Sequence, residues 1–158
     1  MKIYTHDDLD YKKINYSKPE KQGTFYYSSI NYDNQPLYLQ TPKMICKKDI
    51  SELIDKGNYN LEMETVNNNH KFYDSILNID DNNVKKTHQY SKEWFEKELP
   101  LDVIDNMYKR TCKPVKKDNK PLFSFKIPMN KNKVYCQVYD QNKICADISK
   151  LTENTEII

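Results

Sequence analysis

Basic and aromatic side chains are concentrated in one stretch of the sequence, from Tyr108 to Tyr139. Between Lys109 and Lys133 it has nine basic residues and one acidic residue, a net charge of +8, whereas the whole chain has a net charge of +2. The basic residues are Lys109, Arg110, Lys113, Lys116, Lys117, Lys120, Lys126, Lys131 and Lys133. Lysines bind phosphates, exposed rings stack on bases, and a duplex hides its base faces, so this composition favours a single-stranded nucleic acid.

Two predicted strands divide part of this stretch into two faces. Residues 122–128 (L-F-S-F-K-I-P) and 133–139 (K-V-Y-C-Q-V-Y) alternate apolar and polar side chains, and M-N-K-N-K between them reads as a turn, which predicts a β-hairpin. The inner face, which we expect to be core, carries Phe123, Phe125, Ile127, Val134, Cys136 and Val138. The outer face carries Ser124, Lys126, Lys133, Tyr135, Gln137 and Tyr139.

The candidate nucleic-acid-binding residues come from this outer face, from the cationic segment before it and from one earlier strand. They are Lys109, Arg110, Lys113, Lys116, Lys117, Lys126, Lys133, Tyr135, Gln137, Tyr139 and Tyr38. The lysines would follow the phosphates, while Tyr135, Tyr139 and Tyr38 would stack on bases. The alternative interpretation is a solvated sheet face, because most surface charge runs have no ligand.

Residues that could carry an enzyme's chemistry are present but poorly grouped. Two glycines in the chain are too few for a phosphate-binding glycine loop. Asp74, Asp80 and Asp81 could ligate a catalytic metal, but they occur among asparagines in a predicted loop, without a basic or histidine partner nearby in sequence. Cys112 has basic neighbours but no nearby histidine, and the four cysteines form no CxxC pair of the kind that binds zinc. We therefore expect no enzyme, no metal and no cofactor.

Along the chain, the sequence predicts a group of strands, then a group of helices, then further strands. Strands are expected at 24–32, 37–46 and 59–65, the last alternating apolar with acidic residues. A helical section of about 69–110 follows, with Ser91 as the expected N-cap of a helix in which Trp94 and Phe95 pack as core, and with Pro100 opening the last helix. This order predicts a mainly β, α+β protein: an OB-fold-like antiparallel Greek-key barrel with a helical insertion.

Composition sets the expected domain limits and compartment. Residues 1–23 are polar and weakly periodic, which predicts a loosely ordered N-terminal arm before one domain over 24–158. The cysteines show no disulfide pattern, and the sequence has no signal peptide and no long apolar segment. These features indicate an intracellular protein that does not enter a membrane.

Three segments resemble a known family. They are P-L-Y-L-Q-T-P-K-M (36–44), S-K-E-W-F-E-K-E-L-P-L-D-V-I-D-N-M-Y-K (91–109) and P-L-F-S-F-K-I-P (121–128). In this order they are similar to the single-stranded DNA-binding proteins of nucleocytoplasmic large DNA viruses, which are related to the short single-stranded DNA-binding proteins of phage replication. The resemblance covers about residues 36–158. It implies an OB-fold that coats single strands during viral DNA replication, recombination or repair, in the host cytoplasm, a viral factory or the virion.

The C-terminus departs from that family. Its members would continue past L-T-E-N-T-E-I-I with a further strand, a turn and a last strand, whereas this chain stops where a helix is expected to begin. We therefore expect a C-terminally truncated barrel with an open edge, which would pair with a second copy or with another chain. The leading hypothesis is a sequence-tolerant single-stranded DNA-binding module, with RNA as an alternative ligand. Other hypotheses are a structural or virion protein that kept the barrel without DNA binding, and an accessory subunit that docks on an enzyme.

Overall fold

Helices and antiparallel strands together make this an α+β protein. The computed structural model describes all residues except 1, 56–59, 68, 113–119 and 131–132. The chain divides into two compact units, and each is assembled from two separate segments. Unit 1 comprises Met1–Thr41 and Asp74–Arg110, and unit 2 comprises Pro42–Tyr73 and Thr111–Ile158. The division differs from the predicted arm followed by one domain, because the first 41 residues join the helical section in unit 1.

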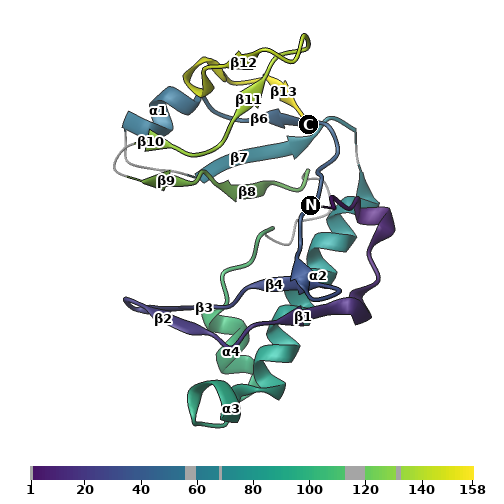
Figure 1. The fold of residues 1–158 in the computed structure, drawn as a ribbon, viewed down its shortest axis with the longest axis vertical. Coiled ribbons are helices and arrows are strands. Elements are labelled where there is room, and N and C mark those ends of the chain that lie inside the picture. Colours follow the sequence, from purple (N-terminus) through teal and green to yellow (C-terminus); the bar gives the residue numbers. More distant parts are fainter. Residues whose placement is uncertain (1, 56–59, 68, 113–119, 131–132) are drawn as a thin grey trace. The chain divides into compact units, whose positions relative to one another are not determined.

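Unit 2 is built on a four-stranded antiparallel sheet (Figure 1). Its strands are β6 (Met44–Cys46), β7 (Asn60–Thr65), β8 (Phe123–Lys126) and β13 (Glu156–Ile157), in the order β13-β6-β7-β8. The last strand therefore lies beside the first, which is the spatial order of a Greek key. Helix α1 (Ile50–Asp55) follows β6 and packs beside the short 3₁₀ helix η3 (Ile148–Lys150), and the Ile50 N–H donates to the Leu151 carbonyl at 3.0 Å. The strands described here do not close into a barrel.

Alternation along β7 builds the core of unit 2, as the sequence predicts. Leu61, Met63 and Thr65 are buried, and they alternate with half-buried Asn60, Glu62 and Glu64. Leu61 pairs with Phe125 and Met63 with Phe123 on the neighbouring strand. The Phe123 ring also lies 5.0 Å, centroid to centroid, from the ring of Phe72, and both side chains are fully buried. These contacts fix β8 in register on β7.

The predicted hairpin between 122–128 and 133–139 is wrong in its pairing. Strand β8 pairs with β7, while the second predicted strand divides into β10 (Lys133–Val134) and β11 (Val138–Tyr139). Strand β10 pairs with β9 (Met129–Asn130), and β11 pairs with β12 (Cys145–Ala146). Pro128 has no N–H to donate, so β8 ends before it and the chain starts a new short strand beyond it. The alternation of faces is confirmed, since Lys126, Tyr135 and Tyr139 are exposed, but of the six residues expected in the core only Phe123 and Ile127 are buried. The other four, Phe125, Val134, Cys136 and Val138, are half-buried.

The N-terminal strands belong to unit 1. Strands β1 (Ile14–Tyr16), β4 (Ile30–Tyr32) and β5 (Gln35–Pro36) form a three-stranded sheet, and β2 (Glu20–Gln22) pairs with β3 (Phe25–Tyr27) in a separate hairpin. The 3₁₀ helices η1 (His6–Asp8) and η2 (Tyr11–Lys13) precede them. The segment expected to be a loose arm is therefore structured, because Ile14 is buried and the Tyr4 ring packs 4.5 Å from that of Tyr32. The strand expected at 24–32 is interrupted between β3 and β4.

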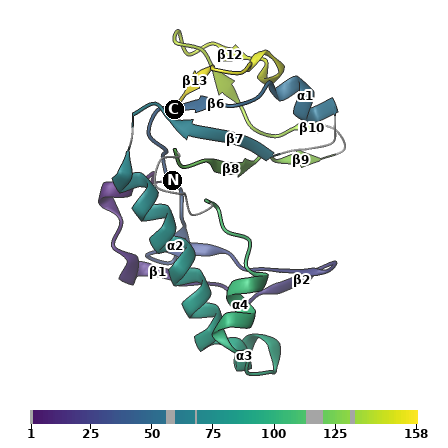
Figure 2. The ribbon, with the colours of Figure 1, turned by 180° about the vertical axis from the view of Figure 1, so that it is seen from behind.

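Unit 1 is completed by α2 (His70–Gln89) from Asp74 onward, α3 (Ser91–Phe95) and α4 (Leu101–Met107), while the first residues of α2 belong to unit 2. Figure 2 shows α2 crossing β1, with α3 and α4 near the C-terminal end of the helix. Asn69 caps α2, since its Oδ1 accepts from the Phe72 N–H at 3.0 Å. Helix α2 is longer than expected and includes the three aspartates that were assigned to a loop. Asp80 is fully buried and accepts a hydrogen bond from the Tyr108 hydroxyl at 2.8 Å.

Three further predictions about where helices and strands begin and end are corrected. Ser91 is the first residue of α3 rather than its N-cap; its buried Oγ accepts from the Leu99 N–H at 3.1 Å and so fastens the loop that follows. The C-terminal residues form β13 instead of starting a helix, with Glu156 opposite Ile45 and Ile157 opposite Met44. The strand expected at 37–46 is reduced to β6, because the chain passes from unit 1 to unit 2 between residues 41 and 42. Within the described residues, no helix has both the length and the apolar character needed to cross a membrane.

Candidate nucleic-acid interface

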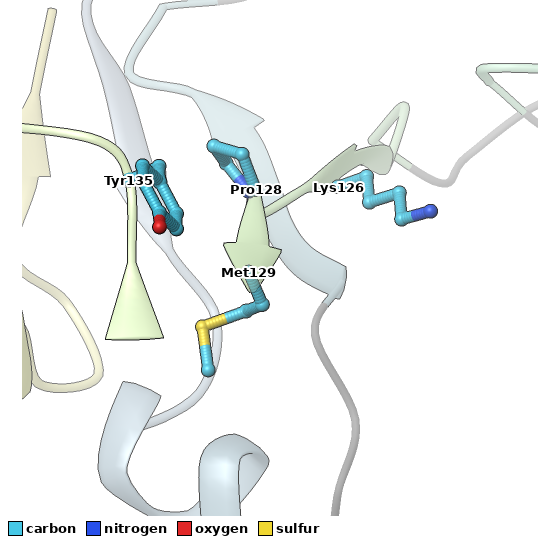
Figure 3. A pocket seen from close by; sticks show the side chains of 4 residues that line it. All are labelled: Lys126, Pro128, Met129 and Tyr135. Carbon is cyan, nitrogen blue, oxygen red and sulfur yellow. The ribbon is translucent and has the colours of Figure 1, made fainter. Parts of the chain in front are cut away.

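A hollow in unit 2 brings together two of the predicted binding residues. It has a volume of about 480 Å³ and is lined by Lys126, Pro128, Met129 and Tyr135 (Figure 3). Lys126 is the last residue of β8, and the buried side chain of Ile127 anchors the chain just beyond it. The Tyr135 N–H donates to the Pro128 carbonyl at 2.8 Å, which holds the tyrosine beside the proline. The position of Tyr135 in the hollow therefore depends on Pro128, the last residue of the strand predicted at 122–128.

The lining groups have the chemistry of a base and phosphate site. The Tyr135 side chain is 65% exposed, so its ring is available for stacking. Figure 3 shows the Tyr135 ring next to Pro128, while Lys126 extends away on the other side of the proline. A stacked base would lie on the aromatic side, and the amine of Lys126 would reach a neighbouring phosphate of the same strand. Met129 adds an adaptable apolar wall.

The charge around the hollow is positive and unneutralised. Among the described residues, neither Lys126 nor Lys133 has a carboxylate within ion-pair distance. The exposed face of the sheet itself is different. Lys126 lies opposite Asn60 on β7, whose outward side chains Glu62 and Glu64 form ion pairs with Lys48 at 3.0 Å and Lys47 at 3.1 Å. The positive surface thus begins at the end of β8, and the predicted basic face does not extend over the sheet.

The other predicted residues of unit 2 are exposed but belong to separate small strands. Lys133 is in β10, whereas Tyr139 is in β11 and is 57% exposed. The Tyr139 hydroxyl donates to Oε1 of Gln137 at 2.8 Å, so these two side chains form one polar and aromatic pair. The single outer face that strand alternation predicted is therefore divided between two two-stranded ribbons, and only Lys126 and Tyr135 line the same hollow.

The remaining predicted residues lie in unit 1 or outside the described residues. Tyr38 is exposed in unit 1, and so is Lys109. Arg110 forms two ion pairs, with Asp81 at 2.9 Å and Asp105 at 2.6 Å, and its hydrogen bonds to both carboxylates raise its pKa. A phosphate would have to displace these carboxylates, so Arg110 ties α2 to α4 and does not present a free charge. Lys113, Lys116 and Lys117 lie outside the described residues.

Pro128 and Met129 are the lining residues that sequence reasoning missed. The dipeptide I-P after an alternating strand was the available signal, because proline ends a strand ladder and redirects the chain. Cys112, considered as a reactive thiol, is fully buried in unit 2, and its Sγ donates to the Leu122 carbonyl at 3.5 Å. Comparison of the chain with protein-family models, curated proteins and solved structures found no match, so the likeness to the viral and phage proteins rests on the three quoted segments alone.

Proposed function

We propose that this protein binds single-stranded nucleic acid through the hollow of unit 2, with little sequence preference and without catalysis. The observation that carries the proposal is the pairing of a widely exposed ring, Tyr135, with the unneutralised amine of Lys126 around one hollow. Lys133, in the neighbouring ribbon, supplies a second cation that has no carboxylate partner within the part of the chain that the structure describes. Stacking tolerates any base because every base has a π-face, so such a site binds strands of many sequences.

The expected energies are modest but measurable. One stacked base contributes roughly 1–3 kcal/mol, and each neutralised phosphate of a single strand adds about −0.7 to the slope of log affinity against log salt. Two lysines and one ring give a weak site on their own. A strand must therefore make several such contacts, as single-strand coating proteins do.

The OB-fold implied by the resemblance is part of the proposal. It is supported by the order β13-β6-β7-β8, because OB barrels are Greek-key structures in which the last strand returns beside the first. It is also supported by the helices between β7 and β8, at the place where the helical insertion was expected. A role in viral DNA replication, recombination or repair follows from the same resemblance.

The test is a titration of a fluorescently labelled poly-dT oligonucleotide, followed by anisotropy at about 50 mM salt, where phosphate contacts are weakly screened. We expect Tyr135→Ala to weaken binding about tenfold, since one stacking contact is lost. Tyr135→Phe keeps the ring and should retain most of the affinity. Lys126→Glu should weaken binding further, while Lys150→Glu, an equal charge change on an exposed residue of the same unit, serves as the matched control.

Two results would contradict the proposal. Absence of binding by the wild-type chain at low salt would favour a structural or virion protein without a nucleic-acid ligand. Equal losses for Lys126→Glu and Lys150→Glu would show that only net charge matters. A parallel titration with poly-U distinguishes DNA from RNA as the preferred strand.

A further inference from the structure

Unit 1 contains a second group of aromatic and basic side chains around a pocket of about 230 Å³. Three rings line it, those of Tyr16, Tyr90 and Trp94, together with the side chains of Lys18 and Lys86. Trp94 was expected to be core, but its side chain is only half-buried. None of these five residues is in the proposed site of unit 2.

The spacing along the helices explains how the pocket forms. Lys86, Tyr90 and Trp94 are four residues apart, and backbone hydrogen bonds from Tyr90 N to Lys86 O at 3.0 Å and from Trp94 N to Tyr90 O at 2.8 Å continue the helical pattern between α2 and α3. Residues four apart lie on one face of a helix, so the three side chains form a stripe. Strand β1 supplies the opposite wall with Tyr16, and Lys18 follows two residues later.

The rings are held in place before any ligand binds. Tyr90 stacks on Trp94 with their centroids 5.4 Å apart, and Tyr16 meets Trp94 edge-on at 6.5 Å. The Tyr16 hydroxyl donates to Oδ1 of Asn83 at 2.7 Å and accepts from Nδ2 of Asn82 at 2.8 Å. The Lys86 amine lies 5.8 Å from the centre of the Tyr90 ring. A rigid aromatic wall with an adjoining cation costs little to organise on binding.

The lining decides the class of ligand. The two lysines disfavour a cationic ligand, and three aromatic rings offer stacking surface, which a simple anion does not use. The volume is below the roughly 300–1,000 Å³ of typical small-molecule pockets, so it suits one ring whose neighbours remain in solvent. A nucleotide within a single strand has this form: a flat base flanked by phosphates. One carboxylate, that of Glu93, also lines the pocket, and its charge is outnumbered by the two amines.

We propose that this pocket is a second single-strand binding site, in which a base stacks against the Tyr90 and Trp94 rings and the flanking phosphates contact Lys18 and Lys86. The choice of ligand rests on the proposed function of unit 2, while the pocket itself is an independent feature of unit 1. Each unit then carries one site for single-stranded nucleic acid.

Trp94 provides a direct test because it is the only tryptophan in the sequence. Unlabelled poly-dT added to the wild-type protein should quench Trp94 fluorescence with saturation, since a base would stack on the indole ring. Lys86→Glu should shift the midpoint of quenching about tenfold to higher concentration through lost phosphate contact. Its matched control is Lys85→Glu, an exposed neighbour on the same helix that does not line the pocket. A dA:dT duplex of equal length should leave the emission unchanged, because its bases are already stacked.

The outcomes separate the two sites. If anisotropy reports binding of labelled poly-dT but Trp94 emission does not change, the binding role of the pocket is refuted and that of the hollow is retained. Equal effects of Lys85→Glu and Lys86→Glu would also refute the binding role of the pocket. If Tyr135→Ala and Lys126→Glu leave both Trp94 quenching and the affinity measured by anisotropy unchanged, the binding role of the hollow is refuted and that of the pocket is retained. Equal quenching by the duplex would also overturn the stacking proposal. Circular dichroism of each variant confirms that it is folded.

Discussion

The hollow of unit 2 and the pocket of unit 1 combine the same types of side chain in different ways. Tyr135 is 65% exposed, and the hydrogen bond that places it comes from its backbone. Tyr16 is held through its hydroxyl by two asparagines. Ordering one mobile side chain on binding costs roughly 0.5–1.5 kcal/mol. The comparison shows that sites sharing tyrosine and lysine can differ in restraint: a bound base would have to order the Tyr135 side chain, whereas hydrogen bonds already hold the Tyr16 ring in place.

Salt dependence tests whether both sites contact phosphates and has the largest expected effect. Four lysines, Lys18 and Lys86 in the pocket, Lys126 at the hollow and Lys133 in the ribbon beside it, give a slope of about −2.8 for a single strand if all four contact phosphates, or roughly a 50-fold loss between 50 and 200 mM salt. The double variant Lys18→Gln/Lys86→Gln should flatten the measured slope by about 1.4. Affinity measured by anisotropy over a salt series gives both slopes.

The control for the salt series is the double variant Lys85→Gln/Lys150→Gln, which removes the same charge from exposed positions outside both sites. It should keep the wild-type slope. If both double variants reduce the slope of log affinity against log salt equally, the lysines of the pocket contribute only long-range electrostatic attraction and no direct phosphate contact.

Removing one hydroxyl from each site measures how much the pocket depends on its fixed ring. Tyr16→Phe removes the hydroxyl that Asn82 and Asn83 hold, so the ring must be ordered when the strand binds. We expect the midpoint of Trp94 quenching to move to about two- to tenfold higher poly-dT concentration. Tyr135→Phe should cost less, because the Tyr135 hydroxyl makes no hydrogen bond to any residue the structure describes. A larger loss for Tyr135→Phe would reverse the comparison.

Alkaline pH should weaken unit 1 through the same hydroxyl. Burial raises the pKa of Tyr16 from 10.0 to about 12, although the hydrogen bond from Asn82 lowers it. In the unfolded chain the phenol ionises near pH 10, whereas in the folded chain it stays protonated until about pH 12. Its contribution to the free energy of unfolding is therefore complete below about pH 10 and is lost as the pH rises through about 12. Burial raises the pKa of Tyr108 as well, so both phenols act in the same direction.

Urea unfolding of the wild type and Tyr16→Phe at about pH 9 and pH 11 isolates this effect, because lysine titration is common to both proteins. The decline in stability should be smaller in Tyr16→Phe. Equal declines would show that the phenol is equally buried in the folded and unfolded chains.

Local patterns in the sequence predicted local structure well. The alternation in β7 and the burial of Phe123 and Ile127 both follow from neighbouring residues. Strand pairing did not follow, because β8 takes its partner from residues about 60 positions earlier and Pro128 removes the donor that a longer strand needs. The prediction of a basic sheet face was wrong for the same reason, because Glu62 and Glu64 join that face only through pairing between strands distant in sequence.

The candidate sites show the same limit. The stripe of Lys86, Tyr90 and Trp94 was visible in the sequence as a spacing of four, but such a stripe usually marks packing. What makes it a pocket is Tyr16, which comes from a strand about 70 residues earlier. Tyr135 and Lys126 could be proposed from composition and strand alternation, and the I-P dipeptide signalled where the strand ends, but not that these two side chains line one hollow.

The interleaving of the two units along the chain sets an order of events during synthesis. Unit 1 has all of its residues once Arg110 has left the ribosome, and the pocket around Trp94 can then be complete. At that moment β6 and β7 have also emerged, but β8 and β13, their outer partners, have not. The nascent sheet thus passes through a stage with both edges unpaired, and such edges are sites of misassembly.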